Sequence, residues 1–556
     1  MRELIKNGTN LLLRRQTSIL SAAFIIMITY GASHIVGLIK TRLLISIFFG
    51  SKSSLLDVYF AAFVIPDTLF QLLVIGSLSA AFIPVFTKLL TRKESDAWYV
   101  AGTSLNLIFI VFFILSLFVF ILAKPFSQLI APGFNPLQIT TMSSLLRVML
   151  TAQLFFCVSG FLTGIIQSHQ RFLIPALAPI AYNLGIIIGT LFLSPTMGIF
   201  GPAVGVVLGA AIHMAIQIPV AIKLGFRFIP SLDFRHPEVK EIMRLMSPRA
   251  IALGIDQIEQ FVAVILSSLL ASGSLTLFNV ARLLYAIPTS LFGVTIGQAA
   301  LPTLSRQSIE TDRRNFRQTL IDSLLQITFL ALPLSTLFIV LRIPIIRLVF
   351  GAKSFPWIAT LITGKMLAIL AISSTFSALM QLIIRGFYAL HDTRTPLVVG
   401  FFAAVFDVAV SIIAVRFLGF GVIGIATAIS LTTILETIIL FILLYPRLHA
   451  DKTFFVRITS SFVKMAIASF ITGFSLWIPM RLLDKFVFDT TRTIPLIGLT
   501  LITSAIGLFA YLLFSYFFRV EELRSFKVLI KRLEDWKNIL MPHSKEPLII
   551  PAPDQN

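Results

Sequence analysis

Two groups of polar residues lie inside long apolar segments of this sequence, where they are candidates for chemistry. The first group comprises Arg282, Lys40, His34, Ser33 and Asp57. Because a charge in a hydrocarbon environment is costly, such a residue usually faces a cavity or a partner. The planar donors of the Arg282 guanidinium match the geometry of a phosphate, so an oxyanion is its expected ligand. The alternative for Arg282 is a structural salt bridge between helices.

Helical spacing indicates which of these side chains share a face. At 100° per residue, Ser33, Gly37 and Lys40 lie within about 40° of one another, while Arg42 points roughly opposite. We therefore expect Lys40 to face a cavity lined by small residues; its alternatives are to reach the membrane surface or to pair with an acid. His34 is expected either to line that cavity or to be a hydrogen-bonded core residue.

The second group is acidic and hydroxylic. Asp256 and Glu259 are three residues apart, and Asp407 and Ser411 are four apart, so each pair shares a helical face. Thr427 lies in the next apolar segment. Carboxylates with hydroxyl and carbonyl oxygens hold Na⁺, or the acids carry protons, so these five residues form the candidate ion-coupling site. The alternative is that each acid pairs with a Lys or Arg inside the membrane.

The sequence lacks the motifs of several kinds of functional site. The sequence contains no G-x-x-x-x-G-K-[ST] loop for nucleotides, no histidine pair with metal-ligand spacing and no Ser/His/Asp arrangement. The single Cys157 excludes an intrachain disulfide and a cysteine metal site. We expect no enzyme activity, no catalytic residue, no metal and no cofactor. Energy is then expected from an Na⁺ or proton gradient, the membrane potential or the substrate's own gradient.

The segments that must position these residues are membrane spans. The 556 residues are 57% hydrophobic and only 13% charged, against about 25% charged in soluble proteins. Apolar runs of about 20 residues predict an all-α polytopic membrane protein with about fourteen spans. They lie near 18–49, 55–90, 100–124, 137–168, 172–194, 199–222, 248–272, 275–305, 318–344, 358–384, 395–418, 420–445, 456–480 and 493–518.

The net charge of +20 follows the membrane topology rather than a nucleic-acid surface. With the N-terminus inside, inner segments hold 30 of the 45 Lys and Arg residues, outer segments hold nine, and six fall within spans. This positive-inside asymmetry predicts that both termini are cytoplasmic. We expect no nucleic-acid partner, and no cleaved signal peptide because the first apolar run is too long.

An internal repeat divides the chain. Residues 65–88 and 287–306 share Ile-Pro-x-x-Leu-Phe, then a Gly, a Pro and a basic residue. Six spans per repeat predict two parallel lobes related by an axis along the membrane normal. The predicted divisions are a first lobe at 1–222, a cytoplasmic linker with an amphipathic helix at 223–247, a second lobe at 248–445, two further spans within 446–518, and an amphipathic helix and tail at 519–556.

Four segments resemble the MurJ (MviN) family of lipid II flippases, in the multidrug/oligosaccharidyl-lipid/polysaccharide exporter superfamily. They are residues 31–84, with Gly-Ala-Ser-His and Ile-Pro-Asp; Pro175-Ala-Leu-Ala-Pro179; residues 271–305, with Ala-Ser-Gly-Ser and Arg282-Leu; and Gly386-Phe-Tyr388-Ala through Thr395-Pro396. The resemblance implies a V-shaped pair of lobes around a cationic cavity, with the last two spans forming a groove for a lipid tail.

The resemblance also assigns residues to that cavity. Arg282 keeps a family arginine, whereas Lys40 and His34 stand where the family has arginines. Phe70 and Gln71 take the place of an arginine pair, and neutral residues replace three family acids. These are Ile75, Ala281 and Tyr285. The cavity is therefore expected to be less cationic than the family pattern.

Together these observations predict a lipid II flippase of the bacterial inner membrane, active in peptidoglycan synthesis, that works by alternating access. Arg282 and Lys40 would hold the pyrophosphate, with His34, Ser33 and Asp57 assisting, although Asp57 is also placed to cap a helix. The expected partners are the lipid-linked pyrophosphate glycan and membrane lipids, with no nucleotide, and a monomer is expected. The alternatives are a flippase for another polyprenyl-linked oligosaccharide, a cation-coupled drug exporter of the superfamily, and a non-transporting scaffold.

Overall fold

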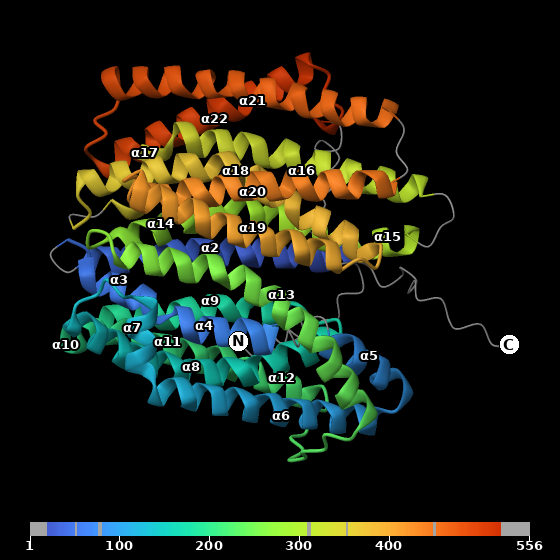
Figure 1. The fold of residues 1–556 in the computed structure, drawn as a ribbon. Helices are drawn as coiled ribbons and strands as arrows, with labels where there is room; N and C mark the ends of the chain where they lie inside the picture. Colours follow the sequence, from blue (N-terminus) through green and yellow to red (C-terminus); the bar gives the residue numbers. More distant parts are fainter. Residues whose placement is uncertain are drawn as a thin grey trace, which may run out of the picture.

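The computed structural model describes residues 19–50, 53–75, 81–308, 313–351, 354–448 and 452–523. Within these ranges the chain is helical and has no β-strand, which confirms the predicted all-α class. Figure 1 shows the helices running side by side in two groups, with a last pair along the upper edge. Helices are expected here because a bilayer offers no water to satisfy backbone polar groups.

The first lobe contains the blue and cyan helices of Figure 1 and provides six spans. It comprises α2 (Ile19–Phe48), α3 (Ser53–Ala62), α4 (Val64–Phe70), η1 (Gln71–Ile75), α5 (Ile83–Arg92), α6 (Glu94–Ile121), α7 (Ala123–Ile130), α8 (Pro136–Ser168), α9 (Leu173–Ile188), η3 (Gly189–Leu193), α10 (Ser194–Met197), α11 (Phe200–Ala215) and α12 (Ile218–Lys223).

The second lobe provides six more spans and is followed by two single helices. It comprises α13 (Pro237–Ser268), α14 (Ser274–Pro288), η4 (Thr289–Val294), α15 (Thr295–Gln307), α16 (Arg314–Val340), α17 (Arg342–Phe350), α18 (Trp357–Ala389), α19 (Arg394–Ile412), η5 (Ile413–Phe417), α20 (Val422–Leu444) and η6 (Tyr445–Leu448). The two single helices are α21 (Lys452–Phe486) and α22 (Thr493–Phe517).

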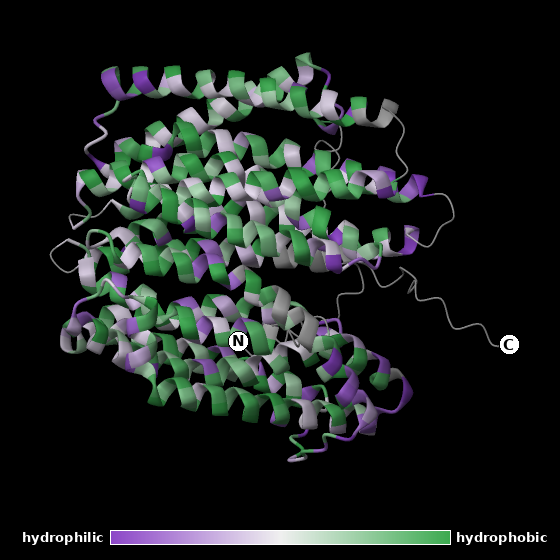
Figure 2. Ribbon diagram, in the orientation of Figure 1, coloured by the Kyte–Doolittle hydropathy of each residue, from purple (hydrophilic) through white to green (hydrophobic). Residues whose placement is uncertain are grey.

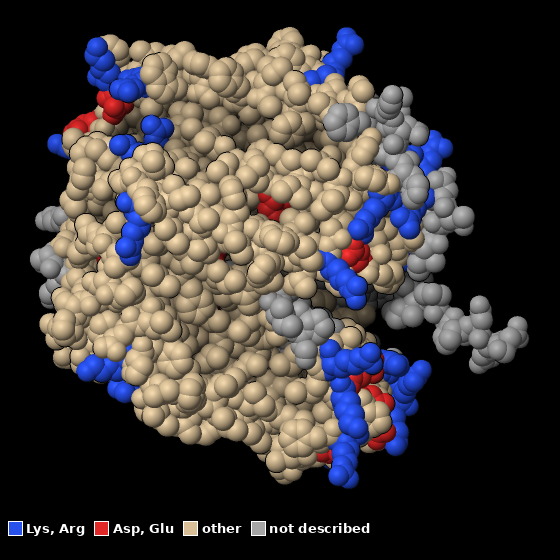
Figure 3. Space-filling view, viewed as in Figure 1, with Lys and Arg blue, Asp and Glu red and all other residues tan. Residues whose placement is uncertain are grey.

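Thirteen helical segments in the described part of the chain are long and apolar enough to cross a membrane. The fourteenth predicted span, 248–272, lies in α13, which is long enough but is not among the thirteen. Its Asp256, Gln257, Glu259 and Gln260 lower its hydropathy. Figure 2 shows hydrophobic residues along most of the helix length, and Figure 3 shows Lys and Arg gathered near the helix ends, as a bilayer requires.

Unusual backbone conformations recur in the two lobes about 220 residues apart. Gln170 before α9 has φ 58°, and His391 before α19 has φ 59°. Gly198 and Gly421 precede the sixth span of each lobe with φ 57° and 56°. A π-helical segment ends the fifth span of each lobe (η3 and η5) and follows each Ile-Pro motif (η1 and η4). The repeated order, without inversion, confirms two parallel six-helix lobes.

A shared hydrophobic core joins the lobes at one end. It contains the fully buried Leu44 and Tyr59 from the first lobe and Phe278, Phe350 and Phe355 from the second. We call this the joined end; it carries residues 42–50, 53–57, 131–135, 266–276, 346–351 and 354–357, at the left of Figure 1. Burying these large side chains stabilises contact between the lobes by about 25 cal/mol per Å² of apolar surface.

At the opposite end each lobe has a core of its own. Phe82, Phe86 and Phe161 pack together in the first lobe, and Phe316 and Phe387 belong to a separate core in the second. We call this the divided end; it carries residues 86–94, 166–172, 304–308, 313–316 and 387–394. The lobes are thus joined at one end and packed separately at the other, as in the expected V shape.

Helix α13 links the two lobes. Near its start, Val239 and Ile242 belong to the first-lobe core, and near its end, Ala263 and Val264 belong to the shared core. The helix begins at Pro237 and continues across residue 247, so the predicted linker helix is the first part of the seventh span. The predicted amphipathic helix and tail, 519–556, lie outside the described residues except for 519–523.

The last two helices pack against the second lobe. The two helices contact each other, α21 lies on α16, and α22 also reaches α17. The Tyr511 hydroxyl of α22 donates a hydrogen bond of 3.0 Å to the backbone oxygen of Phe329 on α16. The pair therefore packs on the second lobe, and the lipid-tail groove that the resemblance implied stays a prediction.

Candidate functional site

Arg282 lies on α14, about 12 Å from the start of that helix at 1.5 Å per residue. The start of α14 is held by Asp57 of the first lobe, whose carboxylate accepts hydrogen bonds from the backbone N–H groups of Gly273 (2.6 Å) and Thr276 (2.8 Å). A carboxylate at a helix N-terminus also interacts favourably with the helix dipole. Asp57 is therefore a capping residue, but it caps a helix of the other lobe.

Arg282 has an acidic environment drawn from both lobes. Its Nη2 lies 3.9 Å from Oε1 of Glu259 on α13, and both side chains are about one-third exposed (34% and 35%). Asp67 of α4 and Asp407 of α19 also interact electrostatically with it. The interhelical salt bridge that was the alternative role for Arg282 is therefore present, but it is long and involves one nitrogen. The other N–H donors of the guanidinium stay available for a ligand.

The α2 candidates lie across the lobe interface from Arg282. His34 Nε2 lies 3.0 Å from Ser290 Oγ of the second lobe, so the histidine is hydrogen-bonded at the junction. Lys40 is half-buried and forms no ion pair with any described residue. Ser33 is also half-buried, and Arg42 donates to the backbone oxygen of Leu348. The cavity role of Lys40 stays a prediction, whereas Arg42 is engaged with the backbone of α17.

The candidate cation site on α19 and α20 contains buried oxygens without partners. Asp407 is 4% exposed and Ser411 is 0% exposed, and among the described residues neither Asp407 Oδ1 nor Ser411 Oγ has a hydrogen-bond partner. The Thr432 hydroxyl lies close enough to interact with the Asp407 carboxylate. Orphaned buried oxygens of this kind require an occupant such as an ion, a proton or water.

The structure adds a hydroxyl to the surroundings of this predicted site. The Thr427 hydroxyl donates its proton to the Ile423 backbone oxygen of its own helix, at 2.9 Å, and its role as a ligand stays a prediction. Thr432, five residues further along, is the hydroxyl that the sequence reasoning missed. Glu259 lies near enough to interact electrostatically with Asp407. The side chain of Asp256 lies outside the described residues.

The described residues contain no group of three or more His, Cys, Asp or Glu side chains placed to hold a metal ion. The α19–α20 oxygens combine one carboxylate with hydroxyls. This mixed, weakly charged set of hard oxygens suits a monovalent cation or a proton better than a divalent metal.

Comparison with known proteins places the chain in a family. The sequence model described as "Lipid II flippase MurJ" matches residues 45–496, most of the chain. The chain belongs to the MurJ family. The resemblance found from Arg282 and the proline segments is thereby confirmed.

Relatives of the MurJ family span nearly the whole chain. A "Probable lipid II flippase MurJ" of Thermotoga maritima is 28% identical over 88% of this chain and 95% of its own length. A "Lipid II flippase MurJ" of Burkholderia cenocepacia is 24% identical over 87% of this chain and 93% of its own. The match therefore includes both lobes.

Solved structures share the fold. A structure titled "Lipid II flippase MurJ, inward closed conformation" has a TM-score of 0.74 and 24% identity, and covers 89% of this chain and 99% of its own. An inward-facing multidrug resistance MATE family transporter of the MOP superfamily has a TM-score of 0.61 and 16% identity, and covers 75% of this chain and 94% of its own. The MurJ structure matches a larger share of the chain.

Proposed function

We propose that this chain moves lipid II, the undecaprenyl-pyrophosphate-linked peptidoglycan precursor, from the inner to the outer leaflet of the bacterial cytoplasmic membrane. The MurJ family match over residues 45–496 carries this proposal. The drug-exporter alternative has less support, because the family model and the relatives that match nearly the whole chain are lipid II flippases.

In this proposal Arg282 and Lys40 hold the pyrophosphate. Arg282 offers a fork of donors at the junction of the lobes, and Lys40 adds a point charge from α2. Asp57 acts indirectly, because its carboxylate is used to position α14. His34 and Ser33 line the same region of α2, with His34 held by Ser290.

The lobes would alternate access by rocking about the joined end. The shared core and the Asp57 cap close that end, while the separate cores leave the lobes independent at the divided end. Lys88, Arg92 and Arg306 lie at the divided end, so the positive-inside rule orients that end, and both termini, towards the cytoplasm. The structure would then represent a state closed towards the outer leaflet.

Cation coupling would use the oxygens of Asp407, Ser411 and Thr432, with Glu259 nearby. Binding of Na⁺ or a proton there satisfies buried acceptors in one lobe only. An ion shifts a conformational equilibrium by the difference between its affinities for the two states. An ion bound here would therefore shift the balance between the two access states through the lobe that carries Arg282.

The test is complementation of a strain depleted of its lipid II flippase. The wild-type chain should restore growth, and Arg282→Ala, expressed in the membrane at the same level, should not. Arg42→Ala is the matched control, because its guanidinium bonds to a backbone oxygen rather than facing substrate. Failure of the well-expressed wild type, with accumulation of a different lipid-linked glycan in the parent organism, would overturn the proposal.

A further inference from the structure

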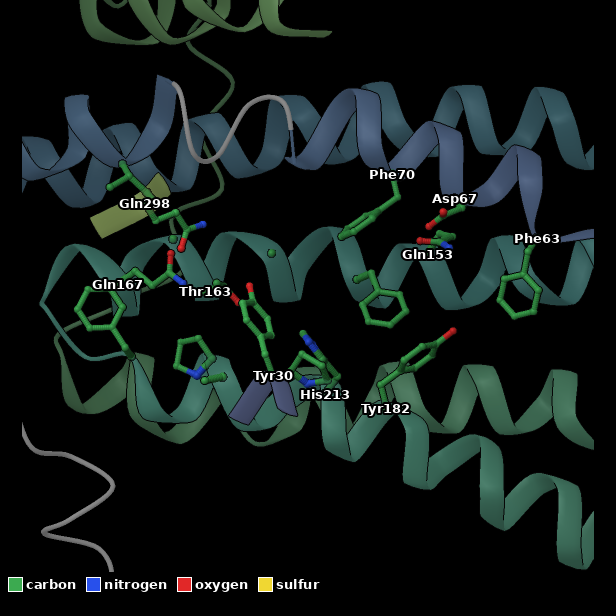
Figure 4. Close-up of a pocket in the computed structure, with 18 residues that line it drawn as sticks. Tyr30, Phe63, Asp67, Phe70, Gln153, Thr163, Gln167, Tyr182, His213 and Gln298 are labelled. Carbon is green, nitrogen blue, oxygen red and sulfur yellow. The ribbon is translucent and has the colours of Figure 1, made fainter. Parts of the chain in front are cut away.

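A separate cavity of about 630 Å³ lies in the first lobe (Figure 4). Its wall is built mainly from α4, α8 and α9. Single residues of four other helices complete it: Tyr30 of α2, Ile83 of α5, His213 of α11 and Gln298 of α15 in the second lobe. Among the described residues that line it, Asp67 alone carries a formal charge, and no Lys or Arg is present. The only formal charge on the described lining of this cavity is therefore acidic.

Aromatic rings form a continuous part of the wall. The ring centroids of Phe156 and Tyr182 lie 5.0 Å apart at 75°, and those of Phe70 and Phe156 lie 5.6 Å apart at 49°. Phe63 and Tyr30 line the same cavity. Aromatic faces carry partial negative charge and attract cations, most strongly where water is excluded.

Two hydrogen-bond acceptors face this aromatic wall without partners. The Asp67 carboxylate makes no hydrogen bond and no ion pair with any described residue. Gln153 is only 4% exposed, and its Oε1 has no hydrogen-bond partner. Figure 4 shows the Asp67 and Gln153 side chains beside each other, with Tyr182 directed towards the same part of the cavity. Leaving the buried Gln153 oxygen without a hydrogen bond is costly, and the half-buried Asp67 carboxylate is open to the cavity.

We propose that this cavity binds a primary ammonium group. Asp67 is its counter-ion, Gln153 accepts a second of its three N–H donors, and Phe70, Phe156 and Tyr182 surround it. Two acceptor side chains are too few for a bare Ca²⁺, which takes about six to eight oxygens, and the aromatic wall adds no oxygen ligand. An anion is excluded by the absence of a basic lining residue within the described part of the chain.

Charges near the cavity permit this assignment. Arg282 acts electrostatically on Asp67, but Glu259 lies 3.9 Å from that guanidinium and offsets part of its charge. His213 also lines the cavity; its Nδ1 lies 2.6 Å from Ser159 Oγ, so that nitrogen is already engaged. Asp67 therefore remains the group that a cation would meet.

The ammonium group has two sources. It is either part of the peptide on the lipid-linked substrate, or a free amine. Because Asp67 and Arg282 are near neighbours, one molecule that carries both a phosphate and an amine would reach both sites. Only the first source depends on the proposed function; the cavity's preference for an ammonium group does not.

The test is binding of dansylcadaverine, a fluorescent primary amine, to the purified full-length chain in detergent. Its N-acetyl derivative keeps the fluorophore and the chain but lacks the charge. We expect saturable binding of the amine, no binding of the acetylated form, and roughly tenfold or greater weakening by Asp67→Asn. Asp96→Asn, at an exposed ion pair with Lys93 in the same lobe, should bind like wild type.

Gln153→Leu keeps the shape of the side chain and removes the orphan oxygen, so it should weaken the amine without lowering the melting temperature. Equal binding of the amine and its acetylated form, or unchanged binding by folded Asp67→Asn, would overturn the proposal. Displacement by lipid II, but not by lipid II acetylated on its free amine, assigns the ammonium group to the substrate. Displacement of the probe by cadaverine but not by lipid II assigns the ammonium group to a free amine.

Discussion

The Asp57 carboxylate accepts hydrogen bonds from both the backbone N–H and the hydroxyl of Thr276, at 2.8 and 2.6 Å. Asp57 belongs to the first lobe and is buried, whereas Thr276 opens the helix that carries Arg282. Gly273, with φ +94°, supplies a third hydrogen bond from a backbone conformation that glycine tolerates best. One carboxylate thus fastens the joined end and fixes the axis of α14.

Replacing Asp57 by Asn should open the joined end more often. The amide keeps one acceptor oxygen but loses the charge and one hydrogen bond, at a cost of roughly 2 kcal/mol. That is about a thirtyfold shift between closed and open populations. Spin labels on either side of the interface, followed by distance measurement, should show the shift. An unchanged distance distribution in folded Asp57→Asn would contradict the role given to this cap.

A disulfide across the same interface should stop transport. Ser53 Oγ of the first lobe lies 3.1 Å from Ser272 Oγ of the second, so Ser53→Cys with Ser272→Cys should crosslink readily under oxidation. The native Cys157 is buried and should not compete. Growth support should be lost when the bond forms and return with reductant. Each single-cysteine variant is the control, and full activity of the crosslinked chain would rule out opening at this end.

Sequence reasoning found the spans, the two lobes and Arg282 because these depend on composition, repetition and single residue types. It did not locate the partner of Asp57, since a cap between helices of different lobes depends on how the lobes dock. It also chose Thr427 over Thr432. Five residues turn a helix by about 140°, so these hydroxyls face different neighbours, and only the packing of α20 against α19 decides between them.

The two threonines make a matched pair for the cation site. In purified protein, Na⁺ should raise the melting temperature over an equal concentration of K⁺, because a ligand at a hundred times its Kd adds about 2.7 kcal/mol. Asp407→Asn and Thr432→Val should abolish that difference. Thr427→Val should keep it, because its hydroxyl bonds within α20. If Na⁺ has no effect, the melting temperatures of the same variants should be compared across pH. A wild-type melting temperature that responds neither to Na⁺ nor to protons would remove this site from the mechanism.

At the divided end, Asp392 lies in the family-like segment that runs from Gly386 to Pro396 and makes its main polar contacts. Partial burial raises the pKa of its carboxyl, but hydrogen bonds from Thr395 and the Arg447 guanidinium outweigh this and lower the pKa from 3.8 to about 2. Asp392 also accepts from the backbone N–H of Arg394 and Thr395, which starts α19. This carboxylate therefore joins α19 to the end of α20.

The lowered pKa of Asp392 sets the pH dependence of its contribution to the free energy of unfolding. Because the folded pKa lies below the unfolded value, the stabilisation is complete above about pH 4 and is lost as the pH falls to about 2. Asp392→Asn should cost about 1 kcal/mol at neutral pH, reduced from the full linkage value because Arg447 is 39% exposed. Unfolding midpoints of wild type and variant should converge near pH 2; a constant gap across this range would refute the linkage.

Transport measured on the isolated protein tests the flippase assignment most directly. Fluorescently labelled lipid II is reconstituted with the chain in liposomes, and a membrane-impermeant quencher is added outside. The wild-type chain should make the whole labelled pool accessible, whereas Arg282→Ala, and the oxidised Ser53→Cys/Ser272→Cys chain, should leave the inner-leaflet share protected. Protection that persists with correctly folded wild-type protein under Na⁺, proton and zero gradients would contradict lipid II transport by this chain.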